Sequence, residues 1–399
     1  MTPSRSRATA ALVALLIGGV ALVVVAVTDD PSSTGPDAGA SGEPWAVVAQ
    51  TEVPPRPGDL LAAFDAVWAT HHGSGEVTRL GADGATVSVD VGEGPVPLAA
   101  GEDAVWVADR SGDALVRLDP DDGAVRASVG LEGPPADVVV AGGSVWASLP
   151  DQGAVARVDE ATGDVLAPVA VGSSPGALLA AGGGVWVADA ADDTAIRVDA
   201  ARGTVTDTIA VGESPVALAE SEGTVWVADF LDDAVTPVPL DPGPGALAAA
   251  PPVRSGGARP VALLAAADSL WVANYSSHTV GRIDPAARRL TVSYDVGDQP
   301  VALAEAGGAV WSADSGSDQV SRVDPASGWG RPVAVPVGPG PGAVVGAGDR
   351  LWVAEHQGSA VTEVDASTPP ARRRDGARRG IAHGGAGHRR RGLGGRLRG

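Results

Sequence analysis

The sequence predicts an all-β fold, a β-propeller of four-stranded blades, from two features that recur together. Tryptophan returns every 38 to 45 residues, and a proline stands eleven residues before each of these tryptophans. A period of about forty residues is typical of propeller blades. Eight repeats predict eight blades, with seven as the alternative count. The tryptophans are Trp68, Trp106, Trp146, Trp186, Trp226, Trp271, Trp311 and Trp352. The prolines are Pro57, Pro95, Pro135, Pro175, Pro215, Pro260, Pro300 and Pro341.

Residues 1–28 are predicted to form a transmembrane helix that acts as a signal anchor. Residues 8–27 are twenty uncharged, mostly aliphatic residues, a length that spans a bilayer as a helix. Arg5 and Arg7 precede this run and Asp29 and Asp30 follow it, so the positive-inside rule places the amino terminus in the cytoplasm. We expect a single-pass protein of the cell membrane with its propeller on the extracytoplasmic side. Secretion after signal cleavage is the alternative.

Residues 29–43 are rich in Ser, Gly, Pro and Asp and are predicted to be a flexible linker to a propeller of residues 44–368. Each repeat offers an apolar strand after its proline, a strand with the tryptophan, a Val-x-Arg-Val-Asp strand and a strand ending in Val-Gly. The eighth repeat has three strands, and residues 47–53 fit its missing fourth strand. Pairing of these segments would close the ring and remove its open sheet edges.

Two segments depart from this pattern. In the fifth repeat, Pro237 and Pro239 replace the Arg and Asp of the third strand, so this blade is expected to be irregular. Residues 369–399 contain ten Arg and one acid, Asp375. Such a segment cannot form a core and is predicted to be a disordered tail.

The composition excludes several classes of function. The formal net charge is −21 and the sequence has no Lys, so the acidic body repels a nucleic-acid backbone and no nucleic-acid partner is expected. The absence of Cys excludes disulfides and Cys-based zinc or thiol sites. The sequence also lacks a nucleophile elbow and a phosphate-binding glycine loop. We expect a monomeric propeller.

Acidic side chains recur three residues after the tryptophans, in the connection between the second and third strands. These positions lie on one face of a propeller, where a ring of carboxylates would attract cations or a basic partner. The predicted ligand-binding residues are Asp109, Asp189, Asp229, Asn274 and Asp314. The alternative is structural, because Asp opens turns by accepting backbone hydrogen bonds.

The four histidines of the propeller all occupy this same connection. His72 and His356 stand four residues after their tryptophans in the first and last repeats, which ring closure makes neighbours. With His71 and Glu355 beside them, they are the predicted site for a divalent metal ion, the candidate cofactor. His278 and His356 are the candidate catalytic residues. Loops commonly carry histidine, so an incidental placement is the alternative.

The repeated tryptophans and arginines are interpreted as framework. Both faces of the tryptophan strand are apolar, as expected when each blade is packed between two others. The repeated arginine of the third strand is predicted to be a structural ion-pair or stacking partner. It recurs as Arg79, Arg117, Arg157, Arg197, Arg282 and Arg322.

The repeat unit, best seen in residues 175–205, resembles the YVTN and NHL-like propeller repeats, including the virginiamycin B lyase-like group. The resemblance covers about residues 45–366, and the segments most similar to the lyase group are residues 270–284 and 351–361. It implies a metal-assisted elimination that uses a catalytic His and metal-binding acids. His278, Glu355 and His356 are the residues that could fill those roles.

Two functions remain open from the sequence. The first is a non-catalytic, membrane-anchored propeller that binds a protein, peptide or cell-envelope ligand through its acidic face. The second is a metal-dependent lyase or hydrolase that acts at the His-bearing rim. A regular array without an enzyme motif favours the first.

Overall fold

The structure, a computed structural model, describes residues 45–82, 84–240, 248–327 and 330–367, together with the strands β1 (Ala14–Ile17) and β2 (Val20–Val23). The predicted linker, residues 29–43, and the predicted tail, residues 369–399, lie outside the described residues. Within residues 8–27, where a helix is expected, the two described segments are strands that pair with each other. Val20 also pairs with Ala217 of β20. No helix in the described part of the chain is long and apolar enough to cross a membrane.

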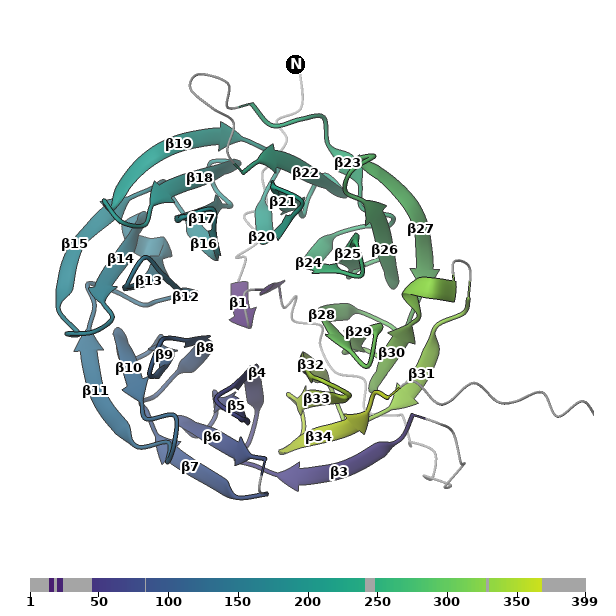
Figure 1. Cartoon of the computed structure of the whole chain (residues 1–399), viewed down its shortest axis with the longest axis horizontal. Helices are drawn as coiled ribbons and strands as arrows, with labels where there is room; N and C mark the ends of the chain where they lie inside the picture. The colour runs from purple at the N-terminus through teal and green to yellow at the C-terminus, as the bar shows by residue number, and fades with distance from the viewer. Residues whose placement is uncertain are drawn as a thin grey trace, which may run out of the picture. The chain divides into compact units, whose positions relative to one another are not determined.

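The described residues between 45 and 367 form a ring of eight antiparallel sheets with the first strand of each blade nearest the centre, which confirms the predicted eight-bladed propeller (Figure 1). Blade 1 has β4 (Pro57–Ala63), β5 (Ala66–His71), β6 (Glu76–Gly81) and β7 (Thr86–Asp90). Blade 2 has β8 (Pro95–Ala100), β9 (Val105–Asp109), β10 (Ala114–Leu118) and β11 (Val125–Gly130). Blade 3 has β12 (Val138–Ala141), β13 (Ser144–Leu149), β14 (Ala154–Asp159) and β15 (Val165–Ala170), with the 3-10 helix η1 (Pro150–Gln152) between β13 and β14. Blade 4 has β16 (Pro175–Ala181), β17 (Gly184–Asp189), β18 (Thr194–Asp199) and β19 (Thr204–Ala210).

The remaining blades keep the same order, and the last one takes a strand from the start of the propeller. Blade 5 has β20 (Pro215–Ser221), β21 (Thr224–Asp229), β22 (Ala234–Pro239) and the two-residue β23 (Val253–Arg254). Blade 6 has β24 (Pro260–Ala266), β25 (Ser269–Asn274), β26 (Thr279–Asp284) and β27 (Arg289–Asp295). Blade 7 has β28 (Pro300–Ala306), β29 (Ala309–Asp314), β30 (Gln319–Val323), the 3-10 helix η2 (Pro325–Ser327) and β31 (Val333–Pro336). Blade 8 has β32 (Pro341–Ala347), β33 (Arg350–Glu355), β34 (Ala360–Asp365) and, outermost, β3 (Val47–Glu52).

Two sequence-based predictions about the blades are confirmed. β3 pairs with β34 from Val47↔Val364 to Glu52↔Ala360, so the first strand of the propeller completes its last blade. Blade 5 is the irregular blade, because its outer strand β23 is only two residues long.

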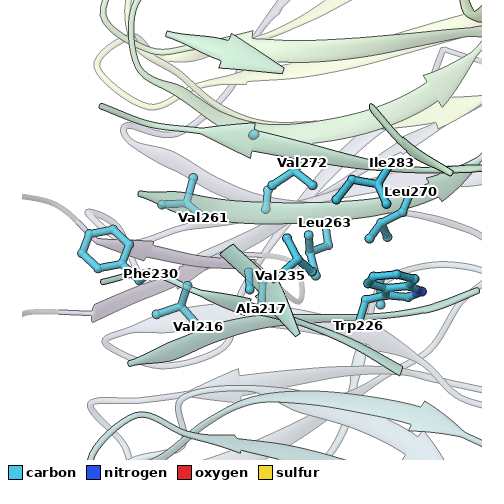
Figure 2. Packing of buried hydrophobic residues seen from close by; sticks show 14 of the residues in the cluster. Val216, Ala217, Trp226, Phe230, Val235, Val261, Leu263, Leu270, Val272 and Ile283 are labelled. Carbon is cyan, nitrogen blue, oxygen red and sulfur yellow. The ribbon is translucent and has the colours of Figure 1, made fainter. Parts of the chain in front are cut away.

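The core consists of apolar layers between adjacent blades. In the layer between blades 5 and 6, Trp226 packs with Leu270 and Ile283. Val216 and Val261 lie at the opposite end of the same cluster, near Phe230 (Figure 2). Seven of the eight repeat tryptophans have no exposed surface. The prediction that the repeat tryptophans form contacts between blades is therefore correct.

In five blades the repeated arginine stacks on the tryptophan of its own blade, whereas Arg322 in blade 7 stacks on Trp45. The guanidinium carbon lies 5.1 Å from the ring centroid for Arg157 on Trp146, and 5.2 Å for Arg282 on Trp271. The same side chains reach the next blade, where Arg157 donates to the Ala201 carbonyl at 3.1 Å. The arginine is thus a stacking partner that also joins neighbouring blades.

Candidate functional site

One end of the ring, the upper end, carries two kinds of connection: those from the second to the third strand of each blade, and those that enter each first strand. Backbone hydrogen bonds hold the two kinds together. Tyr275 N–H donates to the Arg259 carbonyl at 3.0 Å, and His356 N–H donates to the Gly340 carbonyl at 2.9 Å. All the predicted site residues lie at this end, at the ends of the second strands or in the connections that follow them.

The predicted ligand-binding acids point into the protein. Asp109 accepts hydrogen bonds from Gly94 N–H at 2.9 Å and Gly112 N–H at 3.2 Å, and its side chain is buried. Asp189 accepts hydrogen bonds from Ser174 N–H and Asp192 N–H, each at 3.0 Å. Each Asp therefore satisfies backbone donors where one blade leads into the next.

The other three members of this predicted set are also fully buried. Asp229 accepts a hydrogen bond from the Thr236 hydroxyl, and burial raises the pKa of Asp229 to about 7. Burial also raises the pKa of Asp314. Asn274 donates through Nδ2 to the Ser255 carbonyl at 3.2 Å. This geometry favours the structural alternative, and the ligand-binding role of the set stays a prediction.

Two members of the predicted metal site have partners elsewhere. His71 is fully buried and its Nε2 lies 2.7 Å from Thr78 Oγ1; burial lowers the pKa of His71 to about 4. Glu355 accepts two hydrogen bonds from Gln50 Nε2, at 2.9 and 3.0 Å, and another from the Thr362 hydroxyl. Glu355 at the end of β33 therefore forms a side-chain link to the closing strand β3.

The candidate catalytic residue His278 has a backbone role. Its φ of 57° lies in the left-handed region, and its Nδ1 accepts a hydrogen bond from Gln299 N–H at 2.9 Å. Asp193 and Asp233 stand at the same repeat position and accept hydrogen bonds from the equivalent N–H groups at 2.9 and 2.8 Å. His278 thus takes the place of an Asp that connects neighbouring blades.

His72 and His356 are the pair that the structure brings together. Their ring centroids are 6.3 Å apart and nearly perpendicular, across the junction of blades 1 and 8. His72 Nε2 and His356 Nδ1 are buried atoms without a hydrogen-bond partner among the described residues. The pKa of His72 is lowered to about 4. The main cause is burial, and the charges of His356, Arg110 and Arg56 contribute less. Burial also lowers the pKa of His356, so both imidazoles are neutral near pH 7. Within the described residues, no group of three or more His, Cys, Asp or Glu side chains is arranged to hold a metal ion.

The exposed acids at the upper end are a different set from the predicted one. They lie nearer the loop tips and in the connections that enter the first strands; we call them the acidic rim. The acidic rim comprises Glu93, Asp113, Glu132, Asp151, Asp192, Glu213, Asp232, Asp233, Asp298 and Asp318. Sequence reasoning missed part of it, although an acid after Val-Gly, as in Glu93, Glu213 and Asp298, is a visible signal.

Comparison with known proteins identifies the fold. No protein-family model and no curated protein matches the sequence. Among solved structures, BamB from Moraxella catarrhalis is 16% identical, with a TM-score of 0.65 over 80% of this chain and 97% of that chain. A catalytically inactive His-to-Ala variant of virginiamycin B lyase from Staphylococcus aureus, solved with quinupristin, is 15% identical, with a TM-score of 0.55 over 80% of this chain and 99% of that chain. The chain shares their propeller fold. At these identities the likeness extends to the fold alone.

Proposed function

We propose that this protein is a non-catalytic binding module whose acidic rim binds a basic protein or peptide. The observation that carries the proposal is the exposure of ten acids at one end of the ring. Like charges that are spaced around a face sum to a potential of several kT, which attracts a cationic partner and speeds its association. The buried acids at the ends of the second strands hold the loops that present this rim.

The distribution of arginine leaves the acidic rim largely uncompensated. The repeated arginines project toward the other end of the ring, the lower end, where the turns from first to second and from third to fourth strands lie. Arg79 donates to the Pro120 carbonyl at 3.0 Å and Arg197 to the Gly182 carbonyl at 3.2 Å. Arg126 pairs with Asp119 at 2.8 Å in the same region. Acids at the lower end are therefore partly neutralised, whereas at the upper end only Arg56, Arg110 and Arg259, among the described residues of these connections, stand against the ten exposed acids.

We also propose that the propeller lies outside the cytoplasm. The apolar run of residues 8–27, with basic residues before it and acidic residues after it, supports a membrane anchor that presents the propeller to the cell envelope. Membrane fractionation of the full chain and protease accessibility of the propeller in intact cells test this part. Recovery of the full chain in the soluble cytoplasmic fraction would contradict it.

We expect a lysine-rich peptide to bind the acidic rim in a salt-dependent manner. The substitutions Glu132→Gln, Asp151→Asn and Glu213→Gln together remove three exposed charges there and should weaken octalysine binding roughly tenfold, as measured by fluorescence anisotropy at low salt. The matched control, Glu102→Gln with Glu222→Gln and Asp349→Asn, removes three exposed charges at the lower end and should change binding little. Equal weakening by both triple variants would show that the peptide does not bind specifically to the acidic rim.

A metal-dependent lyase is the second candidate, and the His72–His356 pair favours it. The two rings lie close together and nearly perpendicular, and each has a buried nitrogen atom without a hydrogen-bond partner among the described residues. Neutral imidazole is the form that binds a divalent metal. The solved lyase with a similar fold is catalytically inactive as a His-to-Ala variant, which is consistent with histidine chemistry on this scaffold. A bound metal would supply Lewis-acid chemistry, and the two imidazoles would hold part of its coordination shell.

Calorimetry with Zn²⁺ separates this candidate from the first. A metal site predicts one Zn²⁺ per chain and loss of that binding in the His356→Ala variant. The control His278→Ala should keep Zn²⁺ binding, because His278 accepts its hydrogen bond from Gln299 in another blade. If the unmodified protein takes up no Zn²⁺ stoichiometrically, the lyase candidate is excluded for that metal.

A further inference from the structure

The layer between blades 8 and 1 differs from the others at its lower end. Trp352, the repeat tryptophan of this layer, is partly exposed, whereas the other seven have no exposed surface. A pocket of about 820 Å³ opens beside it. Small apolar residues of β4, β5 and the turn after β6 line this pocket, together with Trp352, Arg350 and Glu363.

One cause of the pocket is a substitution in the third strand of blade 8. Glu363 stands opposite Trp352 in β34, where six other blades have the repeated arginine and five of these stack it on their own tryptophan. A Glu side chain is shorter than Arg and cannot form the cation–π contact over the indole. In its place, Arg350 Nε contacts Glu363 Oε1 at 3.3 Å. The indole face that an arginine covers in five other blades is left open.

The second cause is a short turn in blade 1. In several other layers, the turn between the third and fourth strands of the following blade covers the tryptophan with a buried residue, such as Ala200 over the layer of Trp146. In blade 1 the segment Gly81–Ala85 is one residue shorter than its counterpart Asp119–Ala124, and Ala82 in it is exposed. Both departures fall at one junction, so they open a single pocket.

The polar groups of the pocket indicate what kind of ligand fits. Arg350 Nη1 is buried and has no hydrogen-bond partner among the described residues. A buried donor without a partner is costly, so a ligand acceptor there would be stabilising. Glu363 and Asp65 also line the pocket and outnumber Arg350, so their charge disfavours an anionic ligand. A flat apolar wall beside an indole favours a planar ring.

We propose that this pocket binds a neutral, planar aromatic small molecule that stacks on Trp352 and accepts a hydrogen bond from Arg350 Nη1. The pocket volume lies within the usual range for small-molecule sites. The site lies at the lower end of the ring, away from the acidic rim. It is therefore independent of the proposed binding of a basic partner.

Nile red, a neutral planar dye with a carbonyl acceptor, is the probe that tests this proposal. The full-length protein should bind one Nile red per chain with an increase in emission and a Kd of about 10 µM, the value expected for a ligand of this size. The anionic dye 1-anilinonaphthalene-8-sulfonate should bind at least about tenfold more weakly because of the local acids. The absence of saturable Nile red binding would overturn the proposal, as would preferential binding of the anionic dye.

A double variant that rebuilds the ordinary layer provides the decisive comparison. In blades 3 and 6, a serine two residues before the tryptophan accepts from the stacking arginine, Arg157 to Ser144 at 3.0 Å and Arg282 to Ser269 at 2.9 Å. Arg350→Ser with Glu363→Arg copies that arrangement and should weaken Nile red binding at least about tenfold without lowering Tm. The control Glu132→Gln changes the net charge by the same amount at the other end and should bind the dye normally. Unchanged dye binding by the double variant would refute the assignment.

Discussion

A chain that begins at residue 54 is expected not to fold into a stable propeller. This truncation removes β3, which supplies the outer strand of blade 8 through pairs from Val47↔Val364 to Glu52↔Ala360. It leaves β34 as an unpaired edge and deprives the buried Glu355 carboxylate of both hydrogen bonds from Gln50. It also deletes Trp45, whose ring lies 4.4 Å from the Arg322 guanidinium carbon. We expect loss of cooperative melting by circular dichroism, with aggregation through the open edge.

Two comparisons make this test specific to closure of the ring. A chain that begins at residue 44 keeps β3 and should melt cooperatively, like the full chain. Gln50→Ala removes only the side chain that donates two hydrogen bonds to Glu355 and should cost about 1–3 kcal/mol, the usual penalty when a buried carboxylate loses part of its donors. A stable monomer from the truncated chain would show that three strands suffice for blade 8.

The fold could be predicted from the sequence because its signals are periodic. Pro and Trp recur at a fixed offset, and the structure places seven of the eight prolines at the first residue of an innermost strand. β12 is the exception, since it begins at Val138, three residues after Pro135. The closing strand was also predictable, because one blade lacked a strand at the end of the chain and one strand was left over at its start. Periodic patterns of this kind report backbone positions that every blade must repeat.

The candidate site was less predictable because sequence position does not reveal the direction of a side chain. Asp189 and Asp192 are three residues apart in one connection, yet Asp189 is buried and Asp192 is exposed. The difference follows from the backbone turn directly after the strand, because the N–H groups of this turn donate to the Asp189 carboxylate. The proximity of His72 and His356 was predictable, since ring closure alone determines it. The pocket beside Trp352 had a sequence signal, Glu363 in place of the repeated arginine, but its meaning required the structure of the neighbouring turn.

Truncation of a fully packed tryptophan is expected to be much more destabilising than the same truncation at Trp352. Trp271 has no exposed surface, donates through Nε1 to the Ala266 carbonyl at 3.0 Å, and stacks on Tyr294 with ring centroids 5.9 Å apart. Trp271→Ala removes all these contacts and should lower the free energy of unfolding by about 5 kcal/mol, at the upper end for a buried aromatic side chain. Trp352 lacks the arginine stack and borders the pocket, so part of its surface is already in contact with water.

For Trp352→Ala we therefore expect a loss of only about 2 kcal/mol, because less apolar area leaves a packed environment. Urea denaturation followed by far-UV circular dichroism measures both variants, with the difference in midpoint as the readout. The comparison is matched, since both residues occupy the same position of the repeat and both changes are Trp to Ala. Equal destabilisation would mean that Trp352 is as well packed as the other repeat tryptophans, which would contradict an open pocket at the junction of blades 8 and 1. A clear difference between the two midpoints would instead show that this junction contributes less to stability than the others, as expected where a ligand site replaces packed side chains.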